Sequence, residues 1–426
     1  MNKILIVSEQ HRNVQIKWGA IEYEMIADEQ EFYFNYPFKN EIDCYRINIA
    51  DNTITTNYFI GIDWVIQDKL CIHVEPKMND DFQIDFFKMV FESLSGIENL
   101  KHLEGLYYVD FNKSWIPIHQ RNDLLSPFLI IQFLILLKKI AKKGLMKTYY
   151  SRTENLRNRI KGKILVSQQI KKNLFKNRLG HNFCNYQEFG IDNDENRFLK
   201  CILFLVEIEL ANFSNFFSKN QYRSFQDIIS YCKPLFERVD SSIALNSDLK
   251  TYNNKFYSEY AEAIKIGNFI LKKNSYKIDN KSKTFSLSPV YWIDMSKLFE
   301  LWVFSKLKEI FPRNGEVTYH DRFKGLIETD ILIKAEGYEC VIDCKYKPQY
   351  LNNSPSLEDK RQLAGYVRMK SVYKLLGISD DKIVKGIILY SNQSSEDSFK
   401  KEDLFSQAID EYVEFYKLGL KLPIID

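Results

Sequence analysis

The segment TDILIKAEGYECVIDCKY, residues 329–346, decides the fold of the C-terminal part of this 426-residue chain. Two apolar runs flank Glu336 and Gly337, and a two-residue turn at such a pair predicts a β-hairpin. Counting outward from that turn pairs Asp330 with Asp343, so both carboxylates lie on one face. The other face would carry the apolar side chains and pack against a core: Ile331, Ile333, Cys340, Ile342 and Cys344.

The two opposed carboxylates indicate a metal site. Directly opposed side chains on neighbouring strands have Cβ atoms about 4.5–5.5 Å apart, which lets both carboxylates hold one hard cation. Lys345 lies two residues beyond Asp343 and therefore points to the same face. The pattern predicts a metal-dependent site formed by Asp330, Asp343 and Lys345.

An acid-x-Lys tripeptide is not specific by itself. Five others start at Glu75, Asp248, Asp279, Glu358 and Asp380. Asp343 differs because it interrupts an apolar strand opposite a second acid, and burying carboxylates without a cation or partner is costly. The alternative is an ordinary hairpin with a surface ion pair between Lys345 and either Asp343 or Glu328.

Glu300 is a candidate third acid of the same site. It lies in LFELWVF, residues 298–304, within a run from Asp294 to Ile310 that predicts a helix. A carboxylate in so apolar a helix is expected to have a binding partner. The alternative is that Glu300 only benefits from a nearby helix N-terminus capped by Asp294 or Ser296.

The chain as a whole is expected to be an α+β multidomain protein. Residues 1–120 contain short alternating runs broken by Asp, Asn and Gly, which predict a β-rich domain. Residues 121–285 contain long apolar-periodic stretches, which predict a mainly helical domain with a polar boundary or linker near its end. Residues 286–426 would form an α/β core with a mixed sheet.

Local charge is more informative than net charge. The 59 basic and 56 acidic residues give only +3, so the totals do not indicate a nucleic-acid ligand. From Lys138 to Arg178, however, fourteen Lys or Arg residues accompany a single acid, Glu154. Arg157, Arg159, Lys161 and Lys163 form the densest part, and clustered cations suit contacts to DNA phosphates. A solvated helix face followed by a basic turn is the alternative.

The sequence favours a cytoplasmic protein that does not enter a membrane. The seven cysteines are an odd number scattered through the chain, and the N-terminus turns polar before the apolar region of a signal peptide could form. The longest apolar run, Phe128–Leu137, falls far short of the roughly 20 residues that span a bilayer and predicts a buried helix. Cys340 and Cys344 are expected to be ordinary strand cysteines, not zinc ligands.

Taken together, these candidate residues resemble the PD-(D/E)xK nuclease superfamily. The resemblance is carried by Glu300, Asp330, the Asp343-Cys344-Lys345 tripeptide, and Gln362 with Tyr366, which match the Q-x-x-x-Y element of the RecB-like branch. Gln362 and Tyr366 are four residues apart and share a helix face. Thr329 stands where the superfamily's name has Pro. The resemblance implies that the C-terminal α/β core is a PD-(D/E)xK endonuclease domain.

Three further segments are similar to the McrC family, the nuclease subunits of McrBC modification-dependent restriction systems. They run from Tyr58 to Lys77, from Glu154 through Arg157-Asn-Arg-Ile-Lys-Gly-Lys163 to Ile164, and from Tyr186 to Lys200. The resemblance implies an McrB-like AAA+ GTPase partner, DNA with modified bases as substrate, and partner binding by the β-rich domain. The chain contains no G-x-x-x-x-G-K-[ST] loop, so GTP would be bound by the partner and not by this chain.

The resemblance also implies roles for the site residues. Asp330, Asp343, the Cys344 carbonyl and Glu300 would bind Mg²⁺ or Mn²⁺, and Lys345 would orient or activate water and stabilise charge on the phosphate. Gln362 and Tyr366 would orient Lys345 or the DNA strand. Two alternatives stay open: a stand-alone defence or repair nuclease of the same superfamily, and a non-catalytic DNA-binding adaptor of a motor.

Overall fold

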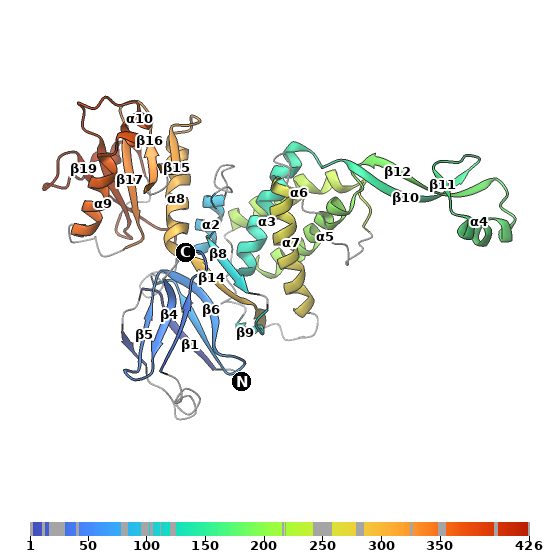
Figure 1. The fold of residues 1–426 in the computed structure, drawn as a ribbon, viewed down its shortest axis with the longest axis horizontal. Helices are drawn as coiled ribbons and strands as arrows, with labels where there is room; N and C mark the ends of the chain where they lie inside the picture. The colour runs from blue at the N-terminus through green and yellow to red at the C-terminus, as the bar shows by residue number, and fades with distance from the viewer. Residues whose placement is uncertain are drawn as a thin grey trace. The chain divides into compact units, whose positions relative to one another are not determined.

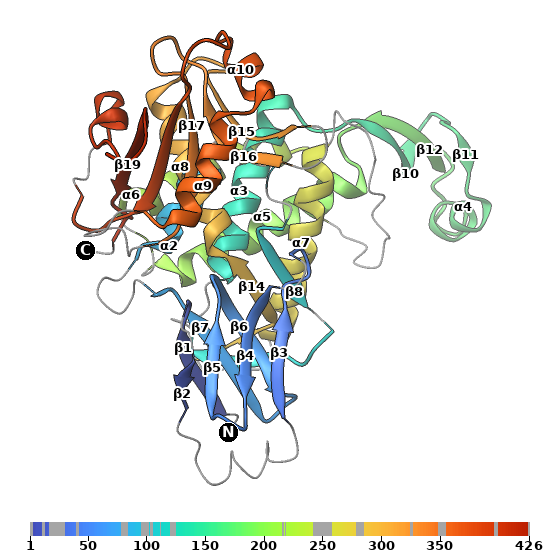
Figure 2. The same ribbon diagram turned by 60° about the vertical axis from the view of Figure 1, so that its left-hand side comes forward.

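The computed structural model describes residues 3–10, 13–16, 30–39, 42–77, 84–94, 102, 105–110, 112–119, 125–214, 217, 219–241, 258–277, 285–323, 327–347, 355–395 and 399–424. The chain forms two compact units (Figures 1 and 2). One unit contains residues 1–125 and 281–426, and the other contains residues 126–280. The division at residues 120 and 285 into three domains stays a prediction, because the first and third parts share one compact unit.

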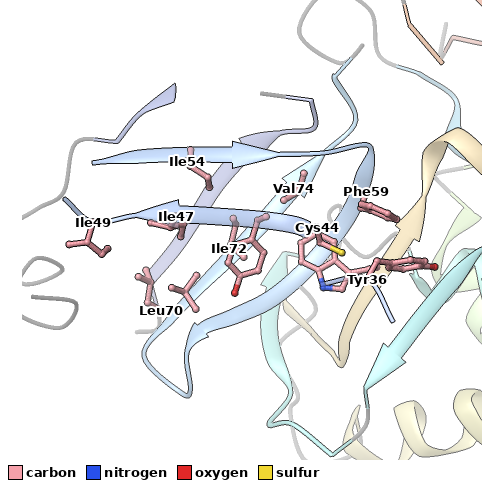
Figure 3. Close-up of a cluster of buried hydrophobic side chains, with 12 residues drawn as sticks. Tyr36, Cys44, Ile47, Ile49, Ile54, Phe59, Leu70, Ile72 and Val74 are labelled. Atoms are coloured by element: carbon pink, nitrogen blue, oxygen red, sulfur yellow. The ribbon is translucent and has the colours of Figure 1, made fainter. Parts of the chain in front are cut away.

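Two β-sheets form the N-terminal part, so the predicted β-rich character is confirmed. One sheet has the order β1-β7-β6-β14-β8 and the other has the order β2-β5-β4-β3. Their strands are β1 (Lys3–Ser8), β2 (Val14–Gln15), β3 (Glu31–Asn35), β4 (Asp43–Asn48), β5 (Thr53–Thr56), β6 (Phe59–Ile66), β7 (Leu70–Glu75), β8 (Tyr107–Asp110) and β14 (Val290–Asp294). Buried side chains of both sheets, including Ile47, Ile54, Ile72 and Val74, form one apolar cluster (Figure 3).

Strand β14 comes from the C-terminal half of the sequence but lies inside the N-terminal sheet. It pairs antiparallel with both β6 and β8, and all five of its residues are buried. Gly61 of β6 permits this pairing, because a Cβ at that position would lie 2.0 Å from the carbonyl oxygen of Tyr291. The close approach of two backbones explains a glycine inside a buried strand.

The unit of residues 126–280 is mainly helical. Its helices include α3 (Leu125–Lys143), α4 (Val166–Lys172), α5 (Asp194–Asn212), α6 (Lys219–Cys232) and α7 (Ser258–Lys277), with 3-10 turns at Leu174–Lys176 and Lys233–Phe236. The run Phe128–Leu137 lies in α3 and is buried throughout, as predicted. None of the helices within the described ranges is long and apolar enough to cross a membrane.

A long β arm extends from these helices (Figure 1). It consists of β10 (Thr148–Arg157), β11 (Lys163–Ile164) and β12 (His181–Gly190), with α4 near its end. The sequence pattern did not indicate these strands. Most of their side chains are exposed or only half-buried, so the alternation of buried and exposed residues that marks a strand is weak.

The C-terminal part contains a mixed sheet, as expected. Its strands, in the order β15-β16-β17-β18-β19, are β15 (Val317–Phe323), β16 (Ile327–Ile333), β17 (Cys340–Lys345), β18 (Lys385–Ser391) and β19 (Phe415–Leu420). The first three are antiparallel, and β17, β18 and β19 are parallel. The remaining elements of this unit are α2 (Phe86–Leu94), α8 (Met295–Ile310), α9 (Leu357–Val367), α10 (Lys370–Leu376), the 3-10 turn Lys401–Phe405, and the paired strands β9 (Ile116–His119) and β13 (Phe285–Ser288).

The hairpin of β16 and β17 is buried on both faces. Ile331, Ile333, Cys340 and Ile342 are fully buried, as expected for the core-facing surface. Leu332 and Val341, on the face of the two aspartates, are also buried and pack in one cluster with Leu363 and Val367 of α9. The aspartates therefore point toward a covered face of the sheet and not toward open solvent.

We expect Gly61→Ala to destabilise the protein by about 1–3 kcal/mol or more, because the added methyl group meets backbone that cannot move without breaking the β6–β14 pairing. Denaturant unfolding of the full chain measures the change. Gly365→Ala is the matched control, since a Cβ there meets no atom within 4 Å and an alanine stabilises a helix by about 0.5–1 kcal/mol over glycine. Equal stabilities of the two variants would contradict the close approach of the two strands.

Candidate metal centre

The hairpin register predicted from the turn is confirmed. Ile331 pairs with Ile342, and Ile333 pairs with Cys340. The Tyr338 backbone N–H donates to the Ala335 carbonyl at 2.9 Å, which closes the tight turn. Gly337 adopts φ 82°, a conformation that favours glycine. The ladder of paired residues ends at Ile331 and Ile342, one position before the predicted pair of Asp330 and Asp343.

The side chain of Asp330 contacts β17 just beyond the last paired residues. Its carboxylate Oδ2 accepts a hydrogen bond of 2.8 Å from the Cys344 backbone N–H. Burial, reinforced by the nearby carboxylates of Glu300 and Asp343, raises the pKa of Asp330 well above its usual value. A cation would stabilise so crowded a set of acids, because a positive ion relieves both the repulsion and the loss of hydration.

Asp343 and Lys345 form a buried ion pair. The Lys345 ammonium lies 3.0 Å from Asp343 Oδ2, and the Asp343 side chain has no exposed area. Burial raises the pKa of Asp343 to about 6 even though the Lys345 charge opposes the rise. Burial opposes the charged form of Lys345 as well, yet the charge of Asp343, with Asp330 and Asp359, raises its pKa to about 12. The ion pair between Lys345 and Asp343, which was the alternative to a metal site, therefore exists, but it is largely buried and not at the surface. The Glu328 side chain lies outside the described residues.

Gln362 and Tyr366 extend this pair along helix α9. The Lys345 ammonium donates to Gln362 Oε1 at 2.8 Å, and Gln362 Nε2 donates to the Tyr366 hydroxyl at 2.7 Å. Ser356 caps the helix by accepting from the Asp359 backbone N–H. The helix thus holds the lysine in one orientation, and the structure brings these two residues to the predicted place.

Glu300 contacts strand β15 from helix α8. Asp294 caps that helix by accepting a 3.0 Å hydrogen bond from the Lys297 backbone N–H. Glu300 is the sixth residue of the helix, beyond the first turn where the helix dipole favours an acid, so the capping alternative does not explain it. Its Oε2 accepts from the Tyr319 hydroxyl at 3.0 Å and lies 3.1 Å from His320 Nε2.

His320 is a candidate site residue that the sequence pattern did not reveal. Tyr319 pairs with Ile331 and Asp321 pairs with Thr329, so His320 stands opposite Asp330. It adopts φ 51°, a strained conformation for a residue other than glycine, which is typical of functional sites. Reading residues 317–323 as a strand paired with residues 327–333 would have placed it there.

Glu300, His320 and Asp330 together form a donor set that could hold a metal ion. One ligand atom from each lies within 4.8 Å of the other two. Of the ligands expected from the sequence, Glu300 and Asp330 belong to this set, whereas Asp343 is held by Lys345 at its edge. Cys344 is buried, and its backbone N–H binds Asp330.

The basic segment lies in the other unit of the protein. Arg157, Arg159, Lys161 and Lys163 are all exposed on the β arm. Lys161 also lies 4.0 Å from the centre of the Tyr186 ring. Exposed apolar side chains accompany these cations: Ile160, Val166, Leu174, Phe175 and Leu179.

The fold and the site define a multidomain protein with an acidic candidate metal centre on a mixed sheet. Residues 54–375, well over half of the chain, match the family described as McrBC 5-methylcytosine restriction system component. The chain belongs to this family and is therefore a component of an McrBC-type restriction system.

Two solved structures from Thermococcus gammatolerans are weakly similar to the chain. One, described as McrB AAA+ hexamers with bound McrC, is 14% identical over 99% of this chain and 95% of that chain, with a TM-score of 0.39. The other, an McrBC complex, is 13% identical over 73% of this chain and 89% of that chain, with a TM-score of 0.31. No curated protein matches the chain.

We expect His320→Asn to weaken Mn²⁺ binding at least about tenfold, as loss of a metal-site contact commonly does. Asparagine tolerates positive φ, so the substitution removes the imidazole without adding strain. Calorimetric titration of the chain with Mn²⁺ measures the affinity. His181→Asn, on the β arm, is the control and should bind as the unmodified chain does. Equal Mn²⁺ affinities of His320→Asn and the unmodified chain would show that His320 is not a ligand.

Proposed function

We propose that this chain is the endonuclease subunit of a GTP-dependent, modification-dependent restriction system of the McrBC type. It would hydrolyse DNA phosphodiester bonds with Mg²⁺ or Mn²⁺ when engaged by an McrB-like AAA+ GTPase. The observation that carries the proposal is the meeting of Asp330, Asp343, Lys345 and Glu300 from three different elements. Membership of the family supports it.

The geometry supports a PD-(D/E)xK core. Two neighbouring antiparallel strands supply Asp330 and the Asp343-Cys344-Lys345 tripeptide, and one preceding helix supplies Glu300. A following helix supplies Gln362 and Tyr366 against the lysine. This order and placement agree with the resemblance seen in the sequence.

Glu300, His320 and Asp330 would hold the metal ion, with Asp343 and the Cys344 carbonyl at the same edge. The buried, mutually repelling carboxylates fit a hard cation, and the imidazole nitrogen also suits Mn²⁺. When bound, the ion supplies a Lewis acid that lowers the pKa of a water molecule and offsets phosphate charge.

Lys345 would act on the scissile phosphate and the attacking water. Its raised pKa keeps it charged at neutral pH, so it stabilises negative charge that develops on the phosphate. Its ammonium is held by Asp343 and Gln362, which fixes the direction of that charge. Tyr366 orients Gln362 and so acts on the lysine indirectly.

The substrate and the partner follow from the family and from the resemblance. The family description names 5-methylcytosine, so DNA carrying that base is the first substrate to test. The chain lacks a phosphate-binding G-x-x-x-x-G-K-[ST] loop, so the GTPase would be another protein. The exposed cations Arg157, Arg159, Lys161 and Lys163 would contact the DNA backbone.

We expect Asp343→Asn and Lys345→Ala each to lower cleavage by about 10²–10⁴-fold, the usual range for loss of one proton-transfer or charge-stabilising group. The assay combines the chain, an McrB-like partner, GTP, Mg²⁺ and DNA with 5-methylcytosine. Asp380→Asn and Lys382→Ala are matched controls, because these residues form an exposed Asp-x-Lys tripeptide in the same unit. Retained cleavage by the Asp343 or Lys345 variant would reject the site.

The same assay separates the alternatives. Cleavage that needs neither partner nor GTP would indicate a stand-alone nuclease. DNA binding without cleavage, both by the unmodified chain and by the site variants, would indicate an adaptor.

Replacing Arg157, Arg159, Lys161 and Lys163 by Gln should lower DNA affinity and reduce the slope of log affinity against log salt by about three to four, because each phosphate contact releases about 0.9 counterion. Filter binding at several salt concentrations measures both quantities. A control with Lys142, Lys219, Arg223 and Lys265 replaced by Gln removes four other exposed cations of the same unit. Equal slopes for the two variants would show that the DNA does not bind at these four residues of the β arm.

A further inference from the structure

The residues directly after strand β1 contact the end of the candidate catalytic strand β17. Gln10 Nε2 donates a 3.0 Å hydrogen bond to the carbonyl of Tyr346, which follows Lys345 in the chain. Gln10 is itself fixed, because its backbone N–H donates to the Asn57 carbonyl at 2.9 Å. An anchored side chain of the N-terminal sheets thus holds the residue next to Lys345.

Tyr346 connects both halves of the candidate site. Its ring is 6% exposed and lies 5.9 Å from the ring of Phe299, the neighbour of Glu300 on helix α8. Around it the chain turns, since the Lys347 backbone N–H donates to the Lys345 carbonyl at 2.8 Å. A shift of Tyr346 would therefore move the end of β17 against α8.

Glu9 adds a second polar contact at the same place. Its carboxyl group is completely buried and accepts from the Lys77 backbone N–H at 3.2 Å. Burial raises the pKa of Glu9 to about 8, against hydrogen bonding from Tyr346 and Lys77, which lowers it. Burying a carboxyl group costs free energy, and an apolar side chain would fill the same space without that cost. Glu9 at this position therefore indicates a specific polar contact.

The same N-terminal sheets also hold the start of helix α8. The Lys39 ammonium lies 2.7 Å from Oδ2 of Asp294, the cap of that helix. The Met295 backbone N–H donates to the Tyr58 carbonyl at 3.0 Å. Glu300 and Lys345 are thus carried by two elements, each of which is tied to the N-terminal sheets.

We propose that Gln10 is a positioning residue, which through the Tyr346 carbonyl keeps Asp343 and Lys345 aligned with Glu300, so that the N-terminal β sheets set the geometry of the nuclease site. This inference rests on the proposed function for its catalytic consequence. The contact itself is structural and can be tested without cleavage.

The test compares Gln10→Asn with Gln15→Asn. Gln10 adopts φ 56°, which asparagine tolerates, and the shorter side chain cannot reach the Tyr346 carbonyl. Gln15 makes the same kind of bond in the same part of the protein, to the Asp51 carbonyl at 3.3 Å and not to a residue next to β17. A third variant, Gln10→Glu, keeps the length and replaces the donor by an acceptor.

Hydrogen exchange of the full-length chain is the first readout. We expect at least about fivefold faster exchange in the peptide covering residues 340–347 for both Gln10 variants, with exchange elsewhere in the mixed sheet unchanged, and no change for Gln15→Asn. Calorimetric titration with Mn²⁺ is the second readout, and we expect a several-fold weaker affinity, because Cys344 of this strand also holds Asp330. Exchange and Mn²⁺ affinity equal to those of Gln15→Asn would overturn the proposal.

Cleavage kinetics supply the third readout. We expect kcat to fall about tenfold or more for Gln10→Asn with KM for DNA unchanged, because a misplacement of about 1 Å is enough for such a loss. A rise in KM for DNA without a fall in kcat would also overturn the positioning role. If the unmodified chain does not cleave, the proposed function fails, while exchange and Mn²⁺ affinity still decide whether Gln10 positions the strand.

Discussion

The insertion of strand β14 into the N-terminal sheet is the constraint on which the candidate site depends. The strand enters between β6 and β8 and ends at Asp294, which caps helix α8. The direction of that helix, and with it the position of Glu300, is therefore set by backbone pairing with residues 180 or more positions earlier in the chain. Gly61 makes the pairing sterically possible, because it lets the two backbones approach closely. The position of Glu300 therefore depends on a glycine that lies far earlier in the chain.

The buried charges explain why the site is costly without a cation. Taking a carboxylate out of water costs several kcal/mol, and one ammonium at contact distance offsets only part of the cost of several acids. Lys345 neutralises one charge, and Asp343 and Asp330 respond with raised pKa values. A fold selected only for stability would place apolar side chains here. The buried acids and the strained backbone of His320 are therefore consistent with the metal-binding role proposed above.

The turn, the register and the buried run Phe128–Leu137 could be read from the sequence because each depends on local chemistry. Glu336-Gly337 sets the register, and alternation then places Asp330, Asp343 and Lys345. The place of His320 depends on the pairing of residues 317–323 with residues 327–333, which a local pattern does not reveal. The β arm was missed because its strands bury only a few side chains, including Leu156, Cys184 and Tyr186, and burial is what creates the alternating pattern. The pairing of β14 with β6 and β8 involves distant segments, on which local patterns carry no information.

Under the proposed function, the arrangement of the site would suit control by another protein. Glu300 reaches the centre from α8, whereas Asp343 and Lys345 reach it from β17, and both elements are tied to the N-terminal sheets by contacts at Asp294 and Tyr346. A displacement of those sheets would change the distance between the two halves of the site without altering any group within either half. Packed elements shift between discrete arrangements and do not deform continuously. Under the proposed function, such a design would let engagement by another protein control cutting, so that the mere presence of DNA would not suffice.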